Sequence, residues 1–562
     1  MAEGTIREQL NRRVAAMTTE RSSFMTHYQE LSEAIQPRRG RFIISDVNKG
    51  ERRHQSIINS RGTQALRTAT AGMLAGVMSP SRPWFSLETP DPDLMEFQPV
   101  KEWLYKVELI LRAIFNQSNL YNMAPVMLSE LLLFGTGFMT HVDDFDNVAR
   151  FYTHTAGSYM LAQNDRLQID TAAREFEWTV EQTVSMFGLG AVSDTVKNMY
   201  DRGHYNSRVK ITHCIYPNRN REGNKLLAAN KAYSSVYYEP ACNDKEKLLR
   251  RSGFDVFPGY ATRWGTTGED IYGTDCPGMV ALGDVRGLQI MERRKAQAVD
   301  KMVNPPLHGP ASLLNRPISA LPGGTTLYDQ NGAGDSSGLR PIYLVQPNLA
   351  DFSKDIERHE TRIDTAFYVQ LWLAISSMEG IQPRNQFELR QRDAERLLQV
   401  GPVLERLHGE FLGPLIDRAF NQCVAAKILP PAPQELANQD LKISYISSLA
   451  QAQRQVATGA IDSLAAFGGG LVKAGWVGAL DKFDADQAMD EYAFINGAPP
   501  RLIVPDDVVA ERRAERAQKE QAAQAMQMAN MGAQTAKSLA DTKTEDGNLL
   551  TRALGKDEPT DE

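Results

Sequence analysis

Three acidic residues, Asp143, Asp144 and Asp146, form the densest carboxylate cluster outside the C-terminal tail. Grouped carboxylates are the ligands that divalent cations use in nuclease chemistry. A working metal site would need further ligands from other segments, and this cluster lies between two expected strands, where acidic residues commonly form a turn. The turn is the favoured interpretation, and a metal-dependent DNA-processing enzyme is kept as an alternative.

Other motifs that carry chemistry are incomplete or missing in the sequence. Gly188-Leu189-Gly190 lacks the third glycine and the preceding strand of a dinucleotide site, and no G-x-x-x-x-G-K-[ST] or H-E-x-x-H string occurs. His213 and Cys214 lie in an expected strand, where a satisfied core pair is favoured over a ligand or nucleophile. The sequence therefore predicts no enzyme activity, no cofactor and no metal site.

Composition narrows the class of protein. The 562 residues predict three or four domains or one large irregular one, and the net charge of −7 disfavours a protein that grips nucleic acid non-specifically. The four cysteines are far apart, which indicates reduced, buried thiols and no disulfide framework or thiolate metal site. The N-terminus has no secretory pattern, and the most apolar window, 124–142, contains Glu130 and two glycines, so we expect no membrane span.

Hydrophobic periodicity indicates the elements that must position these residues. Helical spacing dominates the N-terminal part, and strand-like alternation dominates between 138 and 264. Helices are expected at 1–36, 60–78, 99–116, 123–134, 180–187 and 193–201. Strands are expected at 138–142, 148–154, 167–171, 174–179, 209–216, 232–239 and 253–263. These elements predict an α+β fold that is predominantly helical.

The C-terminal part reads as helices punctuated by glycine and proline. They are expected at 385–429, 444–467, 485–496 and 506–540. We expect the first to break at Gly401-Pro402 and Gly413-Pro414, and the second to end in a hinge at Gly468-Gly469-Gly470. The helix at 506–540 has few large aliphatic residues, so it would be weakly stable alone and would gain from bundling with copies. Beyond Asp541 the tail is polar, acidic and expected to be disordered.

The chain is organised around residues 283–392, which read as helix, Pro/Gly-rich interruption, helix, loop and helix. The first helix ends at Asn304-Pro305-Pro306, because proline lacks the amide donor and restricts the residue before it. The second runs from Asn348 to about Ser376, with Phe352, Ile356, Ile363, Phe367 and Leu371 on one stripe. Glu357, Glu360 and Asp364 follow one flank of that stripe, while Lys354, Arg358 and Arg362 lie behind it and toward the other.

Two interpretations of these flanks remain open on pattern alone. Copies placed side by side could set the basic side of one against the acidic flank of the next, a head-to-tail contact that closes into a ring if the rotation permits. Alternatively, the helix has a solvated face with ordinary pairs inside the helix.

A series of motifs then occurs in a recognisable order. Ser81-Arg82-Pro83-Trp84-Phe85 and Phe134-Gly135-Thr136-Gly137 are followed by Arg263-Trp264 and by Gly268-Glu269-Asp270-Ile271-Tyr272-Gly273. Pro277-Gly278, Leu282-Gly283-Asp284 and Leu288-Gln289 come next. In this order the chain resembles the head-to-tail connector, or portal, proteins of short-tailed bacteriophages over about residues 5 to 500.

The resemblance implies a ring-forming portal fold with wing, stem, clip and crown regions. N-terminal helices and a strand-rich wing would occupy 1–282, and the remaining regions follow in order along the chain. They are a first stem helix at 283–303, a clip at 304–347, a second stem helix at 348–377, a tunnel loop at 378–388, long wing helices at 389–440, a crown at 441–505, a barrel helix at 506–540 and a disordered tail at 541–562.

The resemblance also implies which residues carry the function. The stem residues Lys354, Glu357, Arg358, Glu360, Arg362 and Asp364 would pair between neighbours or face the channel. The tunnel loop would contain Met378, Glu379, Gly380, Gln382, Pro383 and Arg384. The clip would dock other proteins through Leu321, Pro322, Gly323, Gly324, Asn331 and Gly332.

The implied function is a passive DNA channel at one capsid vertex. The subunit would form a twelve-membered ring, dock the large subunit of terminase during packaging, receive tail or adaptor proteins afterwards and pass DNA at ejection. Major capsid or scaffolding protein would surround it, double-stranded DNA would pass without sequence specificity, and no membrane would be involved. Its location would be the virion, after assembly in the host cytoplasm. The alternatives are the DNA-processing enzyme and a non-portal structural virion protein.

Overall fold

The computed structural model describes most of the chain, in stretches separated by gaps. These are residues 5–42, 53, 55–91, 94, 97–144, 146–221, 227–244, 246–303, 307–308, 340–341, 348–377, 400–436, 441–445, 464–473, 476, 483–489, 504, 506–541, 543–544 and 547–548. The chain divides into two compact units. The first contains Met1–Glu88, Lys106–Pro431 and Lys442–Ala466, and the second contains Thr89–Tyr105, Ala432–Leu441 and Phe467–Glu562. Among the described helices, none is long and apolar enough to cross a membrane.

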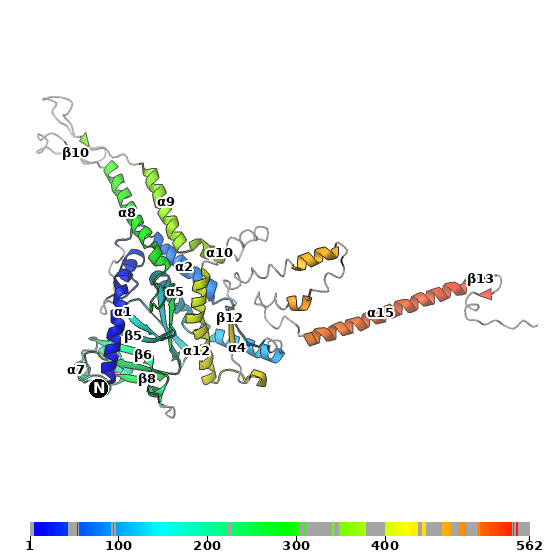
Figure 1. The fold of residues 1–562 in the computed structure, drawn as a ribbon, viewed down its shortest axis with the longest axis horizontal. Coiled ribbons are helices and arrows are strands. Elements are labelled where there is room, and N and C mark those ends of the chain that lie inside the picture. The colour runs from blue at the N-terminus through cyan, green and yellow to red at the C-terminus, as the bar shows by residue number, and fades with distance from the viewer. Residues whose placement is uncertain are drawn as a thin grey trace, which may run out of the picture. The chain divides into compact units, whose positions relative to one another are not determined.

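Figure 1 shows the order of the elements along the chain. The helices are α1 (Ile6–Ile35), α2 (Arg61–Val77), α4 (Gln98–Gln117), α5 (Leu120–Phe134), α6 (Val180–Phe187), α7 (Asp194–Asp201), α8 (Pro277–Val303), α9 (Leu349–Ala366), α10 (Val369–Ser377), α12 (Gly413–Ala425) and α15 (Asp506–Asp541). The longer strands are β1 (Phe85–Glu88), β2 (Thr136–Asp144), β3 (Val148–His154), β4 (Tyr159–Gln163), β5 (Ile169–Thr179), β6 (Arg208–Pro217), β7 (Tyr233–Tyr238), β8 (Arg250–Phe254), β9 (Gly259–Arg263) and β12 (Lys442–Tyr445).

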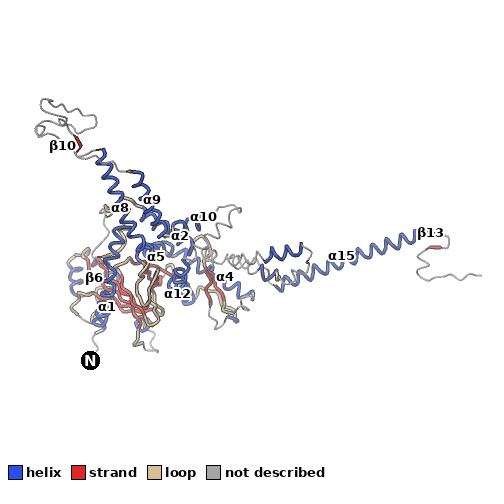
Figure 2. Tube along the Cα trace, turned by 45° about the horizontal axis from the view of Figure 1, so that its top comes forward, coloured by secondary structure: helices blue, strands red, loops and turns tan. Residues whose placement is uncertain are grey.

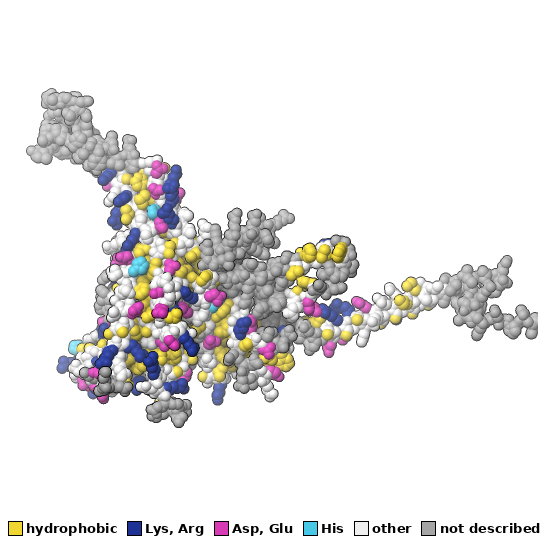
Figure 3. Space-filling model, viewed as in Figure 1, with side chains coloured by type: hydrophobic (Ala, Val, Ile, Leu, Met, Phe, Trp, Pro, Cys, Tyr) yellow, Lys and Arg dark blue, Asp and Glu magenta, His cyan; other side chains and the backbone are white. Residues whose placement is uncertain are grey.

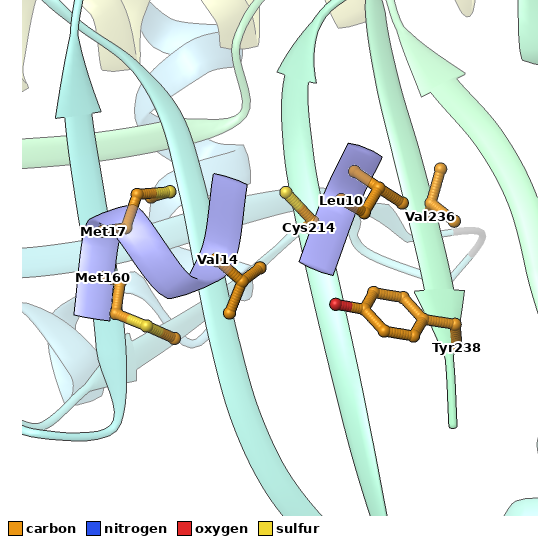
Figure 4. Close-up of a cluster of buried hydrophobic side chains, with 8 residues drawn as sticks. Leu10, Val14, Met17, Met160, Cys214, Val236 and Tyr238 are labelled. Atoms are coloured by element: carbon orange, nitrogen blue, oxygen red, sulfur yellow. The ribbon is translucent and has the colours of Figure 1, made fainter. Parts of the chain in front are cut away.

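A five-stranded antiparallel sheet in the order β4-β5-β6-β7-β8 is packed on both faces. Helix α1 covers one face, where Leu10, Val14 and Met17 form one buried apolar cluster with Cys214 and Val236 of the sheet (Figure 4). The other face carries a second apolar cluster. It contains Val180, Val184, Val192 and Val196 of the α6–α7 region together with Ile211 and Leu249. Because both faces of the sheet are buried, β6 has apolar residues on both of its faces, with Cys214 on one and Ile211 on the other.

Helix α5 lies in the core of the first unit. Its residues from Met127 to Phe134 are all buried, and the helix ends at Gly135, whose φ of 78° is the left-handed conformation that favours glycine. Strand β2 follows directly and pairs with β3 and β9 in a three-stranded sheet. Helix α8 approaches α5 closely at Gly278, where a Cβ atom would lie 2.5 Å from the Leu133 carbonyl oxygen.

Several sequence predictions are confirmed. Helix α1, helix α2, strand β3 and helix α6 fall where the periodicity placed them, within a few residues at each end. The predicted core pair in β6 is also present, because His213 Nε2 lies 2.9 Å from Ser235 Oγ and its ring stacks on Tyr237. Burial lowers the pKa of His213 and raises that of Cys214 to about 12. The four cysteines are free, and three of them are buried.

Other predictions about helix ends are wrong. The first helix of the central stretch begins at Pro277, six residues before the expected Gly283, because proline fits the first turn of a helix. The second central helix is two helices, α9 and α10, separated at Phe367 and Tyr368. In the described part of 385–429, the chain is helical from residue 400 to 425, so the break expected at Gly413-Pro414 is absent, while the residues just before Gly401-Pro402 lie outside the described part. Residues His408–Leu412 form a π-helical turn in which Gly413 N–H bonds to His408 O, and this shift in the ladder accommodates Pro414.

Predictions for the strands and the crown also need correction. The strand expected at 253–263 is two strands, β8 and β9, interrupted around Pro258. Strand β4 was not expected, and the two strands expected between 167 and 179 form the single strand β5. Ser444 and Tyr445, expected to start a helix, lie in β12, which pairs with the distant β1. Residues 464–473 are helical, so the expected hinge at Gly468-Gly469-Gly470 is not a break.

Candidate functional site

Helices α8 and α9 form an antiparallel hairpin (Figures 1 and 2). Ile356 and Ile363 of α9 are buried, as are Val285 and Leu288 of α8. Polar contacts also join the two helices, since Lys295 Nζ donates to Ser353 Oγ at 3.1 Å and His359 Nδ1 lies 2.9 Å from Asp284 Oδ1. Gly287 gives the His359 ring its space, because a Cβ atom there would lie 3.1 Å from His359 Cε1.

The three basic side chains that the sequence singled out on α9 are all exposed. Arg358 Nη1 lies 3.0 Å from Asp355 Oδ1, one helical turn away, and Arg362 Nη1 lies 3.5 Å from Asp284 Oδ1 of α8. The two guanidinium side chains remain 73% and 66% exposed, so these pairs contribute little to stability and leave the charges available. Lys354 lies between these residues and Glu357 on the outward side of the helix, which α8 does not cover.

The acidic flank of α9 is partly occupied within the same chain. Asn59 Nδ2 donates to Glu360 Oε1 at 2.9 Å and to Glu292 Oε1 of α8 at 3.0 Å, which uses both of its amide hydrogens. Arg61 holds Asp364 through two hydrogen bonds, one of them from Nε to Oδ1 at 2.7 Å, and this contact raises the pKa of Arg61. The segment before α2 is therefore fastened to one edge of the hairpin.

Gln289 fixes the position of that segment. Its Oε1 accepts from the backbone N–H groups of Ile58 and Asn59 at 2.7 and 2.9 Å, and its Nε2 donates to Asn59 O at 2.8 Å. Sequence reasoning missed Asn59 and Arg61, and no local pattern could have found them, because their partners lie some 230 and 300 residues away. Of the three acidic residues on the flank, Glu357 is the one that is exposed and has no ion-pair or side-chain hydrogen-bond partner among the described residues.

The outward face of α8 is basic as well. Arg286, Arg293, Arg294 and Lys301 are exposed there, and Arg286 Nη2 lies 3.3 Å from Glu30 Oε2 of α1. Figure 3 shows Lys and Arg side chains along both margins of the hairpin, with apolar side chains between them. The hairpin thus presents two basic outer faces, one on each helix, and a negatively charged edge.

Helix α9 ends at a kink that the sequence did not indicate. Tyr368 has a φ of 54°, a left-handed conformation that costs a non-glycine residue roughly 1–2 kcal/mol. The buried Trp372 stabilises the kink, because its Nε1 donates to Phe367 O at 3.1 Å and its Cβ packs directly on Gly72 of α2. Helix α10 is thereby docked on α2 and leads toward residue 378.

An ion pair behind the kink connects three distant segments. Arg263, at the end of β9, donates to Glu410 in the π-helical turn from its backbone N–H at 2.8 Å and from its side-chain Nε at 3.0 Å. Its Nη1 also donates to Asp270 O at 2.9 Å, and its Nη2 donates to Leu167 O at 3.0 Å. The next residue, Trp264, stacks on Tyr368 with ring centroids 6.4 Å apart. The Arg263-Trp264 motif therefore supports the kink.

Two groups of predicted site residues lie outside the described part of the chain. These are the tunnel-loop residues Met378, Glu379, Gly380, Gln382, Pro383 and Arg384 and the clip residues Leu321, Pro322, Gly323, Gly324, Asn331 and Gly332. Between the ends of the hairpin, the structure describes one short antiparallel pair, β10 (Leu307–His308) with β11 (Arg340–Pro341).

The carboxylate cluster of the alternative enzyme interpretation does not converge. Asp143 lies 3.5 Å from Arg418 Nη2, while Asp144 pairs with Arg150 at 3.5 Å and accepts from the backbone N–H of Asp146. The Asp144 contacts belong to the connection between β2 and β3, whereas the Asp143 contact joins β2 to helix α12. Within the described ranges, no three His, Cys, Asp or Glu side chains are grouped so that they could hold a metal ion.

Comparisons with known proteins give a consistent result. The family model described as "Bacteriophage head to tail connecting protein" matches residues 7–504. A portal protein of Salmonella phage epsilon15 is 44% identical over 551 residues, and a probable portal protein of Bordetella phage BPP-1 is 43% identical over 554 residues. Each alignment covers 98% of this chain and 98% of the relative. A solved chain from the neck of an empty GTA particle covers 83% of this chain at 12% identity, and its TM-score of 0.37 is too low to bear on the fold.

Proposed function

The chain belongs to the family of bacteriophage head-to-tail connecting proteins, and we propose that its α8–α9 hairpin lines the DNA channel of a ring whose subunits join edge to edge along α9. Membership and the high identity to two portal proteins over the whole chain make it a portal subunit. It is a structural component of the phage particle at the head–tail junction, and its ring contacts capsid, tail and packaging proteins.

The finer assignments follow from that role. We assign the wing to 1–282, the stem to 283–303 and 348–377, the clip to 304–347, the tunnel loop to 378–388, the second set of wing helices to 389–440 and the crown to 441–505. A ring of twelve copies would dock the large terminase subunit during packaging and tail or adaptor proteins afterwards. Packaging would take its energy from the terminase ATPase, and assembly would take place in the host cytoplasm.

The exposed charges on α9 are the observation that supports an edge-to-edge ring. Glu357 and Arg362 are five residues apart, which places them about 140° apart around the helix and so on opposite edges. The outward-facing Lys354 lies between them. An acidic residue on one edge and a basic residue on the other allow each copy to pair with the next in the same sense around a ring. The segment at Asn59, which is hydrogen-bonded to the acidic edge, would hold that edge in one conformation for contact with the neighbouring subunit.

The same geometry supports a place for Lys354 in the channel. Its ammonium lies on the side of α9 that faces away from α8, so in such a ring it would face the DNA. A few basic groups against a net charge of −7 per subunit can centre a duplex without holding it. Tight binding would oppose movement, because each neutralised phosphate adds affinity that must be lost at every step.

Charge reversal on α9 tests the edge pairing. Glu357→Arg and Arg362→Glu should each reduce the fraction of protein in rings, measured by analytical ultracentrifugation and negative-stain microscopy, because like charges would meet at every interface. The double variant Glu357→Arg/Arg362→Glu should restore rings. Lys354→Glu is the matched control, since it reverses a charge on the same helix away from both edges. The pairing is wrong if Lys354→Glu impairs assembly as strongly as Arg362→Glu, or if the double variant is no better than the single ones.

A further inference from the structure

The face of the five-stranded sheet that points away from α1 carries a straight row of four side chains, the arginine row. Strand pairing sets Arg174 of β5 beside His213 of β6. It also sets His213 beside Tyr237 of β7, and Tyr237 beside Arg250 of β8. Cys214, the residue after His213, faces α1, so the row is on the opposite face. The His213 and Tyr237 rings stack with their centroids 3.8 Å apart, and an arginine stands on each side of them.

Neither arginine side chain of the row has a hydrogen-bond or ion-pair partner among the described residues. The Nε–H group of Arg174 is buried and unbonded, and its guanidinium lies over the Phe176 ring, 4.6 Å from the centroid. Burial lowers the pKa of His213, and the charges of Arg174 and Arg250 lower it further, so both guanidinium groups lie near its ring. A buried donor without an acceptor and two like charges near one ring both cost stability unless an anion lies among them.

Two carboxylates of the described strands and their ends lie on this face of the sheet, and neither neutralises the arginines. Asp170 is four residues from Arg174 along β5, which is about 13 Å at the rise of a strand. Glu239 follows β7, and its two oxygens accept from the N–H and Oγ of Ser193 at 3.0 and 2.5 Å. The arginine row therefore has two positive charges that the described part of the sheet does not compensate.

Hydroxyl groups lie beside the row on the same face. Ser235 is two residues before Tyr237, and its Oγ lies 2.9 Å from His213 Nε2. Ser252 of β8 pairs with Ser235 in the strand register and is partly exposed. Guanidinium N–H groups form a fork that matches two oxygens of a phosphate, and serine hydroxyls donate to phosphate oxygens as well. The donors on this face are therefore those of a phosphate site.

We propose that the arginine row binds one dianionic phosphate group, with a guanidinium group on each side of it. Free phosphate or a phosphate monoester carries about −1.5 to −2 charge near pH 7, which matches two arginines. A carboxylate of an acidic peptide or a phosphodiester of the DNA backbone carries a single charge and would leave one arginine uncompensated. The site is on the five-stranded sheet and requires neither the channel nor the α8–α9 hairpin.

Isothermal titration calorimetry of the full-length protein with inorganic phosphate, at an ionic strength held constant with sodium chloride, tests the site. The parent should bind one phosphate per subunit in a saturable way. Arg250→Gln, at an exposed position where the change does not threaten folding, should weaken this binding at least tenfold, and Arg174→Gln should do the same. Arg251→Gln is the matched control, because Arg251 is the next residue of the same strand, is also exposed and lies on the opposite face. It should change the affinity less than twofold.

Two further probes identify the source of the phosphate group. Adenosine monophosphate should bind about as tightly as inorganic phosphate if the row takes the terminal phosphate of a nucleotide, and at least tenfold more weakly if it takes the free ion. Three results would overturn the inference: no saturable binding of phosphate to the parent, equal weakening by Arg250→Gln and Arg251→Gln, or preferential binding of a duplex without terminal phosphates. Each of these results would leave the portal assignment in place.

Discussion

Replacing Gly72 with alanine tests how tightly α10 is docked on α2, and therefore how firmly the kink at the end of the stem is held. A Cβ atom at position 72 would lie 2.4 Å from the Cβ of Trp372, 2.9 Å from its Cγ and 3.2 Å from its Cα. The tryptophan cannot move aside easily, because its side chain is fully buried and its Nε1 is bonded to Phe367 O. The clash is with atoms close to the backbone, so the whole of α10 would have to shift.

Two effects of opposite sign set the size of the change. Alanine is favoured over glycine inside a helix by about 1 kcal/mol. Overpacking a core costs about 1–3 kcal/mol, and contacts this short at a main-chain position indicate the upper end of that range. We expect Gly72→Ala to lower the free energy of unfolding by about 2 kcal/mol. The matched control is Gly283→Ala in α8, where no atom lies within 4 Å of the added methyl group, and it should stabilise by about 0.5–1 kcal/mol.

Urea unfolding of unassembled subunits, followed by tryptophan fluorescence, measures both changes. The midpoint should fall for Gly72→Ala and rise for Gly283→Ala, and the rings formed by Gly72→Ala should be less stable. Shifts of the same sign and size in the two variants would refute the reasoning, because they would mean that α10 is not packed on Gly72.

Two further changes test the interior of the first unit. Burial raises the pKa of the Glu108 carboxyl to about 7. Its contribution to stability is therefore full below the unfolded pKa of about 4.3 and is lost as the pH rises through about 7. The free energy of unfolding should fall by up to about 3 kcal/mol between about pH 4.5 and 7.5, and Glu108→Gln should remove this fall. Arg263→Ala should cost about 3–5 kcal/mol, because it leaves the Glu410 carboxylate without its charged partner. Arg150→Ala, which breaks the exposed pair with Asp144, should cost less than about 1 kcal/mol in the same urea assay.

The sequence predicted elements whose signals are local. Helix α1 has a long uninterrupted apolar stripe, and strand β3 lies between turn residues, so periodicity was sufficient for both. No glycine or proline marks the break at Tyr368 in the sequence. The contacts of Trp372 with Gly72 and with Phe367 O determine where α9 ends. The strand at Ser444 forms only because β1, more than 350 residues earlier, is there to pair with it.

Glycine and proline misled the prediction where tertiary structure compensates for them. Pro414 lacks an N–H group, yet the helix continues because the π-helical turn before it shifts the hydrogen-bond ladder by one residue. The candidate site was predictable in the same partial way. The charged flanks of α9 follow from helical spacing, but the fastening of Glu360 and Asp364 by Asn59 and Arg61 depends on contacts between remote segments.

Cryo-electron microscopy of the purified full-length protein tests the central claim most directly. The account predicts closed rings with an axial opening, with α9 of every subunit lining the opening and Lys354 pointing into it. Single subunits, or rings in which the hairpin is packed inside each subunit away from any axial opening, would contradict it.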